Sequence, residues 1–248
     1  MRLFLVISFV AGCARSSQIS PFFTPGAGPT SVIANPSNVM PHDIYHEVGP
    51  SETLWRISKT YGVDADAILQ ANHLNNPNQL KNGQKLLIPE TLGPRAVITL
   101  YPNRRWTHII VHHTASDFGN ARTIDSMHHD RGFWNGLGYH FLIDNGTVEK
   151  FDGQIEVGPR WVKQEVGAHT KASNMNERGI GISLVGNFSQ DLPSEKQMDS
   201  LVFLVKTLQS YYHIPNKNVL GHRDVPGANT ECPGTRFPWR EFKQKLAS

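Results

Sequence analysis

Three residues in the C-terminal part of the chain carry side chains that bind transition metals. His112 ends the apolar segment "IIVH", while His222 and Cys232 lie in the Gly- and Pro-rich segment "GHRDVPGANTECPG". Two imidazoles and one thiolate suit zinc, and a site with three protein ligands keeps a fourth position for water, as catalytic zinc sites do. Neither HExxH nor CxxC occurs. The spacing alone therefore leaves Cys232 as a metal ligand, a nucleophile or a small buried apolar residue.

Most of the other histidines have surroundings that indicate no chemistry. His128 and His129 adjoin Asp130 and Arg131, and we expect them on the polar face of a helix. A further group is expected to be structural or exposed, in the N-terminal region or at loop ends: His42, His46, His73, His108 and His213.

From about residue 96, strand-like and helix-like segments alternate, which predicts one α/β domain over residues 95–246. The Asn-Gly pair in "GLGYHFLIDNGTVEKF" is typical of a β-hairpin. "NARTIDSMHHDRG" predicts a helix with Ile124 and Met127 facing inward. The longest helical pattern has Ser194 as its N-cap and ends before Pro215. Its apolar face is expected to comprise Met198, Leu201, Val202, Val205 and Leu208.

Residues 43–90 predict a small β-α-α-β unit. Ser51 is the expected N-cap of its first helix, whose apolar face is Leu54, Ile57 and Tyr61, and Pro89 is expected to stop the last strand. The segments "GPSETLWRISKTYGV", "ILQANHL" and "LKNGQKLLIP" resemble a LysM module. The resemblance implies binding to the N-acetylglucosamine-containing glycan of peptidoglycan or chitin. "ETLGPR" is a short linker to the next domain.

The N-terminus has the order of an export signal: Arg2, an apolar stretch too short to span a bilayer, and small residues before Cys13. Val10 to Cys13 resemble the lipobox of bacterial lipoproteins. The resemblance implies that residues 1–12 are removed and that Cys13 is acylated. Ala14 then favours the periplasmic face of the outer membrane. The alternative is an ordinary secretory peptide. Residues 13–42, rich in Ser, Pro, Gly and Asn, are expected to be a flexible tether.

The composition excludes one class of partner. The formal net charge is only +3 over 248 residues, and no Lys/Arg cluster stands out, so nucleic acid is not an expected ligand. We expect contact with a membrane only through the lipid anchor.

Four segments, in this order, resemble the type 2 N-acetylmuramoyl-L-alanine amidases and the peptidoglycan recognition proteins: "IIVHHTAS", "GLGYHFLIDNGTVEKF", "VGAHTKASNMNERGIGISLVGNF" and "GHRDVPGANTECPGTRFPW". The resemblance implies a mixed central sheet flanked by helices and one Zn²⁺ per chain. His112, His222 and Cys232 match the family's zinc ligands, whereas His113 matches a position that is not a ligand. The implied reaction is hydrolysis of the amide between N-acetylmuramic acid and L-alanine of the stem peptide, by water that zinc activates.

Three more residues match family positions near the reaction. Tyr139 matches a tyrosine that assists catalysis, His169 a histidine near the scissile bond, and Thr230 the position two before the last ligand. Ser183 stands where AmpD-like members have Glu, so a carboxylate base is not supplied there. Two other functions stay open: a noncatalytic peptidoglycan binder, and a Cys-His hydrolase with Cys232 as nucleophile and His222 or His169 as base.

Overall fold

The structure is a computed structural model that describes residues 29–34, 40–102, 104–132 and 135–248. The predicted signal, Cys13 and most of the predicted tether lie outside these ranges. Among the helices in the described ranges, none has the length and apolar character needed to cross a membrane.

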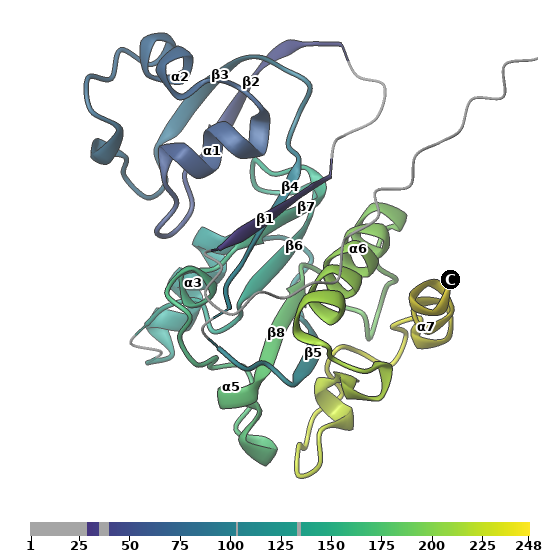
Figure 1. Ribbon diagram of the computed structural model, residues 1–248. Coiled ribbons are helices and arrows are strands. Elements are labelled where there is room, and N and C mark those ends of the chain that lie inside the picture. Colours follow the sequence, from purple (N-terminus) through teal and green to yellow (C-terminus); the bar gives the residue numbers. More distant parts are fainter. Residues whose placement is uncertain (1–28, 35–39, 103, 133–134) are drawn as a thin grey trace, which may run out of the picture.

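The N-terminal unit is a two-stranded antiparallel sheet with two helices (Figure 1). It comprises β2 (His42–Glu47), α1 (Leu54–Tyr61), α2 (Ala65–Ala71) and β3 (Lys85–Thr91). Leu54, Ile57 and Tyr61 are buried in its core, as predicted.

Two local predictions for this unit are wrong. Thr53, not Ser51, is the N-cap of α1, because the Thr53 hydroxyl accepts the Arg56 N–H at 3.3 Å. β3 also continues through Pro89 to Thr91. β3 pairs with β2 alone, and a strand with one free edge tolerates a residue that lacks an N–H donor.

The predicted tether contains a strand. β1 (Thr30–Ala34) pairs antiparallel with β4 (Ala96–Leu100), from Thr30 opposite Leu100 to Ala34 opposite Ala96. Val32 packs against the main core. Thr30, Val32 and Ile33 are β-branched residues, which favour a strand, but the Ser, Pro and Gly of the surrounding segment obscured this signal.

The main domain contains a five-stranded sheet in the order β7-β6-β8-β5-β9. β5 (His108–His113) lies between β8 (Gly179–Leu184) and β9 (Val219–Gly221) and is parallel to both. β6 (Phe141–Asn145) is parallel to β8, and the hairpin expected at Asn145 joins it to antiparallel β7 (Asp152–Val157). The predicted mixed sheet is confirmed.

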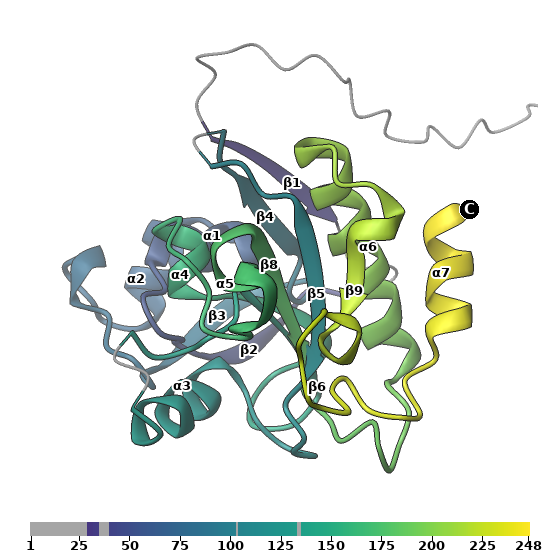
Figure 2. The same ribbon diagram turned by 90° about the horizontal axis from the view of Figure 1, so that it is seen from below.

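Helix α6 (Glu195–Tyr212) covers one face of this sheet, and α7 (Trp239–Ala247) lies beyond it (Figure 2). Ser194 is its N-cap, as predicted, in a capping box with Gln197. Met198, Leu201, Val205 and Leu208 are buried against the sheet, while Val202 is partly buried. Burial of this face is the main source of apolar stabilisation in the domain.

The opposite face carries α3 (Ala121–Asp130) and α5 (Met175–Arg178), whereas Trp161 of the short α4 (Pro159–Val162) packs in the same core as α6. Ile124 is buried as predicted, but Met127 is 40% exposed. His128 faces inward in its place, and its Nδ1 accepts the Gly138 N–H at 3.0 Å, so the prediction of a polar helix face at His128 is also wrong. Single turns of 3-10 helix complete the chain: Pro77–Gln79, Ala172–Asn174, Asn216–Asn218 and His222–Asp224.

Candidate metal centre and active site

Strand alternation explains why only one of two adjacent histidines reaches the site. Consecutive residues of β5 point to opposite faces of the sheet. His113 lies on the α6 side, where its Nδ1 accepts the Phe188 N–H at 3.1 Å. His112 therefore lies on the other face, at the end of β5, and is 1% exposed.

The structure brings His112, His222 and Cys232 together. One ligand atom from each lies within 4.8 Å of the others, and Cys232 Sγ is 3.6 Å from His112 Nδ1. β9 runs beside β5 and leads directly into His222. The Cys232 carbonyl accepts the Arg223 N–H at 2.8 Å, and the His113 N–H donates to Cys232 Sγ at 3.4 Å. Backbone contacts thus hold the loop with its thiol at the strand end.

This geometry fits zinc. Zn–S and Zn–N bonds of about 2.3 and 2.1 Å at a tetrahedral angle separate the two ligand atoms by roughly 3.6 Å, the distance seen between Cys232 and His112. Burial lowers the pKa of His112 and of His222, so both imidazoles are neutral and each has a lone pair that can bind a metal ion. Burial raises the pKa of the Cys232 thiol to about 12 in the chain alone. A bound cation reverses this effect and holds the thiolate.

His169 orients His112. The ring Nε2 of His169 is 3.2 Å from the Gly179 carbonyl, to which it can only donate, so Nδ1 is an acceptor. It lies 3.1 Å from His112 Nε2, which must then carry the proton of that ring. His112 Nδ1 is left with its lone pair toward Cys232. A hydrogen bond to the outer nitrogen of a ligand is how proteins fix the tautomer of a metal-binding histidine.

His169 lies beside His112 and is enclosed by the protein. Both its nitrogens are engaged within the protein and it is 8% exposed, so it has no donor left for a substrate near the scissile bond. Gly181 makes room for it, since a Cβ at that position would come within 2.4 Å of the His169 ring. His140 lies behind it, and accepts the Gly181 N–H at 2.9 Å. No motif in the sequence pointed to His140.

Tyr139 lines the site beside the ligands. Its ring centroid is 5.2 Å from that of His112, and burial raises its pKa to about 12, so the phenol is a proton donor at neutral pH. Ser183 is fully buried and pairs with His112 across β5 and β8. Thr230 is exposed, and its hydroxyl accepts the Cys232 N–H at 3.2 Å, so it supports the loop that holds the thiol.

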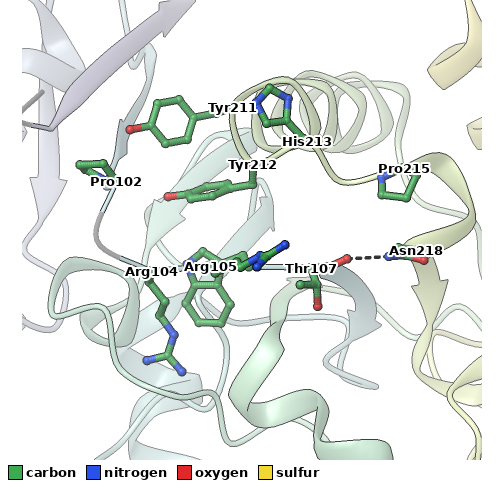
Figure 3. Close-up of a pocket in the computed structure, with 10 residues that line it drawn as sticks. Pro102, Arg104, Arg105, Thr107, Tyr211, Tyr212, His213, Pro215 and Asn218 are labelled. Atoms are coloured by element: carbon green, nitrogen blue, oxygen red, sulfur yellow. Dashed lines mark hydrogen bonds between the residues drawn. The ribbon is translucent and has the colours of Figure 1, made fainter. Parts of the chain in front are cut away.

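A separate pocket of about 560 Å³ lies at the other end of β5 (Figure 3). Arg104, Arg105, Tyr211 and Tyr212 contribute to its walls. None of the predicted site residues lines it, and the Arg104 guanidinium is already bound to the Gln164 and Glu177 carbonyls. The pocket therefore has no part in the chemistry at the metal ligands.

Comparison with known proteins agrees with this site. Residues 102–235 match the N-acetylmuramoyl-L-alanine amidase family, and residues 46–89 match the LysM domain. Peptidoglycan-recognition protein SC2 of Drosophila simulans is 32% identical over 146 residues, which are 55% of this chain and 72% of that protein. N-acetylmuramoyl-L-alanine amidase of Sus scrofa is 31% identical over 140 residues, 51% of this chain and 21% of that protein.

Among solved structures, N-acetylmuramoyl-L-alanine amidase LysC from Clostridium intestinale is 37% identical, covering 58% of this chain and 87% of that chain with a TM-score of 0.49. The family match extends over more than half of the sequence and includes His112, His222 and Cys232. The chain therefore belongs to the N-acetylmuramoyl-L-alanine amidase family, with a LysM domain preceding the amidase domain.

Proposed function

We propose that this protein is a zinc-dependent peptidoglycan hydrolase that cleaves the amide between N-acetylmuramic acid and L-alanine. The observation that carries the proposal is the convergence of His112, His222 and Cys232 on one point. His112 is buried whereas the other two are half-buried, so the ligands have a protein side and a side that a substrate can reach. Two relatives that bear the name N-acetylmuramoyl-L-alanine amidase support the choice of reaction.

Zinc, when bound by these three residues, supplies a Lewis acid that activates water and polarises the amide carbonyl. The chain's own residues perform the remaining tasks. His169 keeps the proton of His112 on Nε2, so Nδ1 stays a ligand. Tyr139 is protonated at neutral pH, so it stabilises the oxyanion by donating a hydrogen bond and can pass its proton to the leaving amine.

Two alternatives are weaker. A noncatalytic binder, as some recognition proteins are, needs no complete ligand set, but this chain has all three residues in place. A thiol nucleophile needs a thiolate, and burial holds the Cys232 thiol in its protonated form. The neutral His112 is its neighbour at 3.6 Å, and no described Lys or Arg lies in hydrogen-bonding contact with the sulfur.

For the N-terminus, we propose cleavage before Cys13, acylation of that residue and anchoring at the periplasmic face of the outer membrane. Labelling with a radioactive fatty acid in a bacterial host tests this. Label in the parent and none in Cys13→Ser supports it, whereas equal label in both contradicts it.

The test of the reaction is mass spectrometry of the products released from purified sacculi, with and without a zinc chelator. Stem peptides with a free L-alanine amino group, absent after chelation, are the expected result. Binding to sacculi without such products would make the chain a peptidoglycan binder. Products that persist after chelation and vanish after thiol alkylation would indicate the Cys-His hydrolase.

A further inference from the structure

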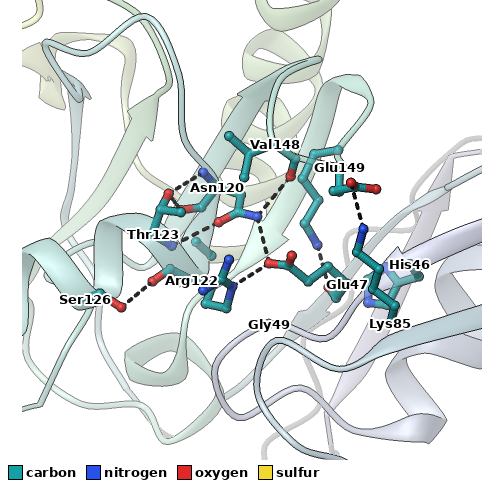
Figure 4. A network of polar contacts seen from close by, with 12 residues as sticks. His46, Glu47, Gly49, Lys85, Asn120, Arg122, Thr123, Ser126, Val148 and Glu149 are labelled. Atoms are coloured by element: carbon teal, nitrogen blue, oxygen red, sulfur yellow. Dashed lines mark hydrogen bonds and ion pairs between the residues drawn. The ribbon is translucent and has the colours of Figure 1, made fainter.

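The LysM domain contacts the amidase domain through buried polar groups (Figure 4). Glu47 of β2 forms an ion pair with Arg122 of α3, and the same carboxylate oxygen accepts a hydrogen bond from Asn120 Nδ2 at 3.2 Å. The Glu47 side chain is 8% exposed. A buried carboxylate needs such partners to remain ionised, so each domain completes the hydrogen bonding of the other.

Lys150 lies deepest in this contact. Its side chain is 2% exposed, and its Nζ donates to the Glu47 carbonyl of the LysM domain and to Glu156 of β7, both at 2.9 Å. Glu156 Oε1 also accepts the Ala121 N–H at 2.6 Å. We refer to Glu47, Asn120, Arg122, Lys150 and Glu156 as the interface network.

The linker between the domains is also held. The Arg95 N–H donates to the Thr60 carbonyl at 2.6 Å, and its guanidinium donates to the Lys59 carbonyl at the C-terminal end of α1. A cation at this position satisfies carbonyls that lack helical partners. The connection between the domains is therefore bound to the LysM helix and is not a free hinge.

A polar hollow of about 390 Å³ is shared by the docked domains. Ser51 and Asn82 of the LysM domain face Asp125, His129, Asn135 and Lys163 of the amidase domain across it. Amides, a hydroxyl and a carboxylate provide both donors and acceptors. Hydroxyl and acetamido groups of a sugar require this mixture, whereas an apolar peptide does not.

Short stretches of chain connect the shared hollow to the residues beside the metal ligands. Gly136 lines the hollow, and Tyr139, three residues on, lies beside His112. His129 lines the hollow, and the ring of its neighbour His128 is 5.4 Å from that of Tyr139. The segments that line the hollow on the amidase side thus continue directly into residues next to the metal ligands.

We propose that the two domains form one rigid body through the interface network and that the shared hollow binds the peptidoglycan glycan strand between the LysM domain and the amidase domain. The ligand is a chain of N-acetylated sugars. The proposal rests on the proposed function for its substrate, but it concerns binding and is tested without catalysis.

The test measures the affinity of the full chain for N-acetylglucosamine oligomers of increasing length by calorimetry. The variants Asn135→Ala and Lys163→Ala change only the amidase side of the hollow. We expect each to weaken binding of long oligomers by roughly 5-fold, the effect of one lost hydrogen bond, and to leave short oligomers unaffected. Lys85→Ala is the matched control, because it removes an exposed ion pair with Glu149 across the same interface.

Two results would overturn the proposal. One is equal affinity of the parent and both hollow variants for long oligomers. The other is equal loss for short and long oligomers, which would indicate damage to the LysM domain itself. If amidase products are absent but the length-dependent loss of affinity is present, the proposed function is wrong and the proposal that the shared hollow binds glycan is supported.

Discussion

Two buried polar clusters in this chain offset the free-energy cost of burying polar groups in different ways. The interface network combines charges of both signs, so Lys150 neutralises Glu156 and Arg122 neutralises Glu47. The metal centre combines three groups that are all neutral in the chain alone, because burial lowers the pKa of the imidazoles and raises that of the thiol. In the interface network, each of these carboxylates has a cationic partner within the protein. The metal centre gains its charge balance only when a cation binds.

Because of this difference, we expect changes at the metal ligands to affect mainly activity and changes in the interface network to affect mainly stability. Removing the metal is expected to abolish the reaction and leave the domains docked, since no residue of the interface network is a metal ligand. Removing a charge from the interface network is expected to destabilise the fold and leave the ligand set intact.

The largest effect is expected from Cys232→Ser. A hydroxyl is a poor zinc ligand, and loss of a ligand exceeds the roughly 100-fold effect of changing a group that only orients one. We therefore expect activity to fall by more than about 100-fold, with little zinc retained. Atomic emission measures the metal, and the melting temperature without metal serves as the control. Full activity in this variant would exclude Cys232 as a ligand.

Lys150→Met tests the other cluster. It leaves Glu156 buried without its cation, and breaking a buried ion pair destabilises a protein by about 3–5 kcal/mol. Denaturant titration measures the free energy of unfolding. Lys85→Ala removes a pair whose side chains are 56% and 46% exposed, and it is expected to leave that free energy almost unchanged. Similar losses in the two variants would contradict the distinction between buried and exposed pairs.

Acid is expected to weaken the LysM side of this interface. Burial alone would raise the pKa of Glu52, but His46 beside it and the charge of Lys150 lower it to about 2. Because the folded-state pKa lies below the ordinary value of 4.5, this contribution is present above about pH 4.5 and is lost as the pH falls toward 2. It amounts to on the order of 3 kcal/mol. Unfolding titrations over this pH range should show a smaller loss for Glu52→Gln than for the parent.

A smaller effect is expected at His169, because this residue orients a metal ligand and is not itself a ligand. His169→Ala is expected to lower zinc affinity by about 10- to 100-fold, because the tautomer of His112 is no longer fixed. His169→Asn keeps an acceptor where Nδ1 lies and should recover part of the affinity. Competition with a chromophoric chelator gives the constants. Unchanged affinity in both variants would show that His169 does not act through His112.

The convergence of His112, His222 and Cys232 could be predicted because their segments follow or adjoin strand ends. His112 follows a buried apolar strand, and His222 and Cys232 share one constrained loop, so their convergence followed from local patterns and the family resemblance. The role of His169 could not be predicted, since its tautomer depends on the Gly179 carbonyl, which only the packed structure brings to it.

The domain interface shows the opposite case. Glu47, Arg122 and Lys150 are far apart in the chain and belong to no shared motif, and each alone resembles a solvated surface charge. β1 was missed for a similar reason, because a short strand among Pro, Ser and Gly becomes ordered only through pairing with β4.

The most direct measurement of the central claim is a zinc titration of the metal-free chain, with release of L-alanine-terminated peptide from a soluble muramoyl peptide as the readout. We expect activity to rise with added zinc and to saturate at one ion per chain, and Cys232→Ser to show no such rise. Full activity in the metal-free chain, or an equal response in Cys232→Ser, would contradict the assignment of His112, His222 and Cys232 as the catalytic metal centre.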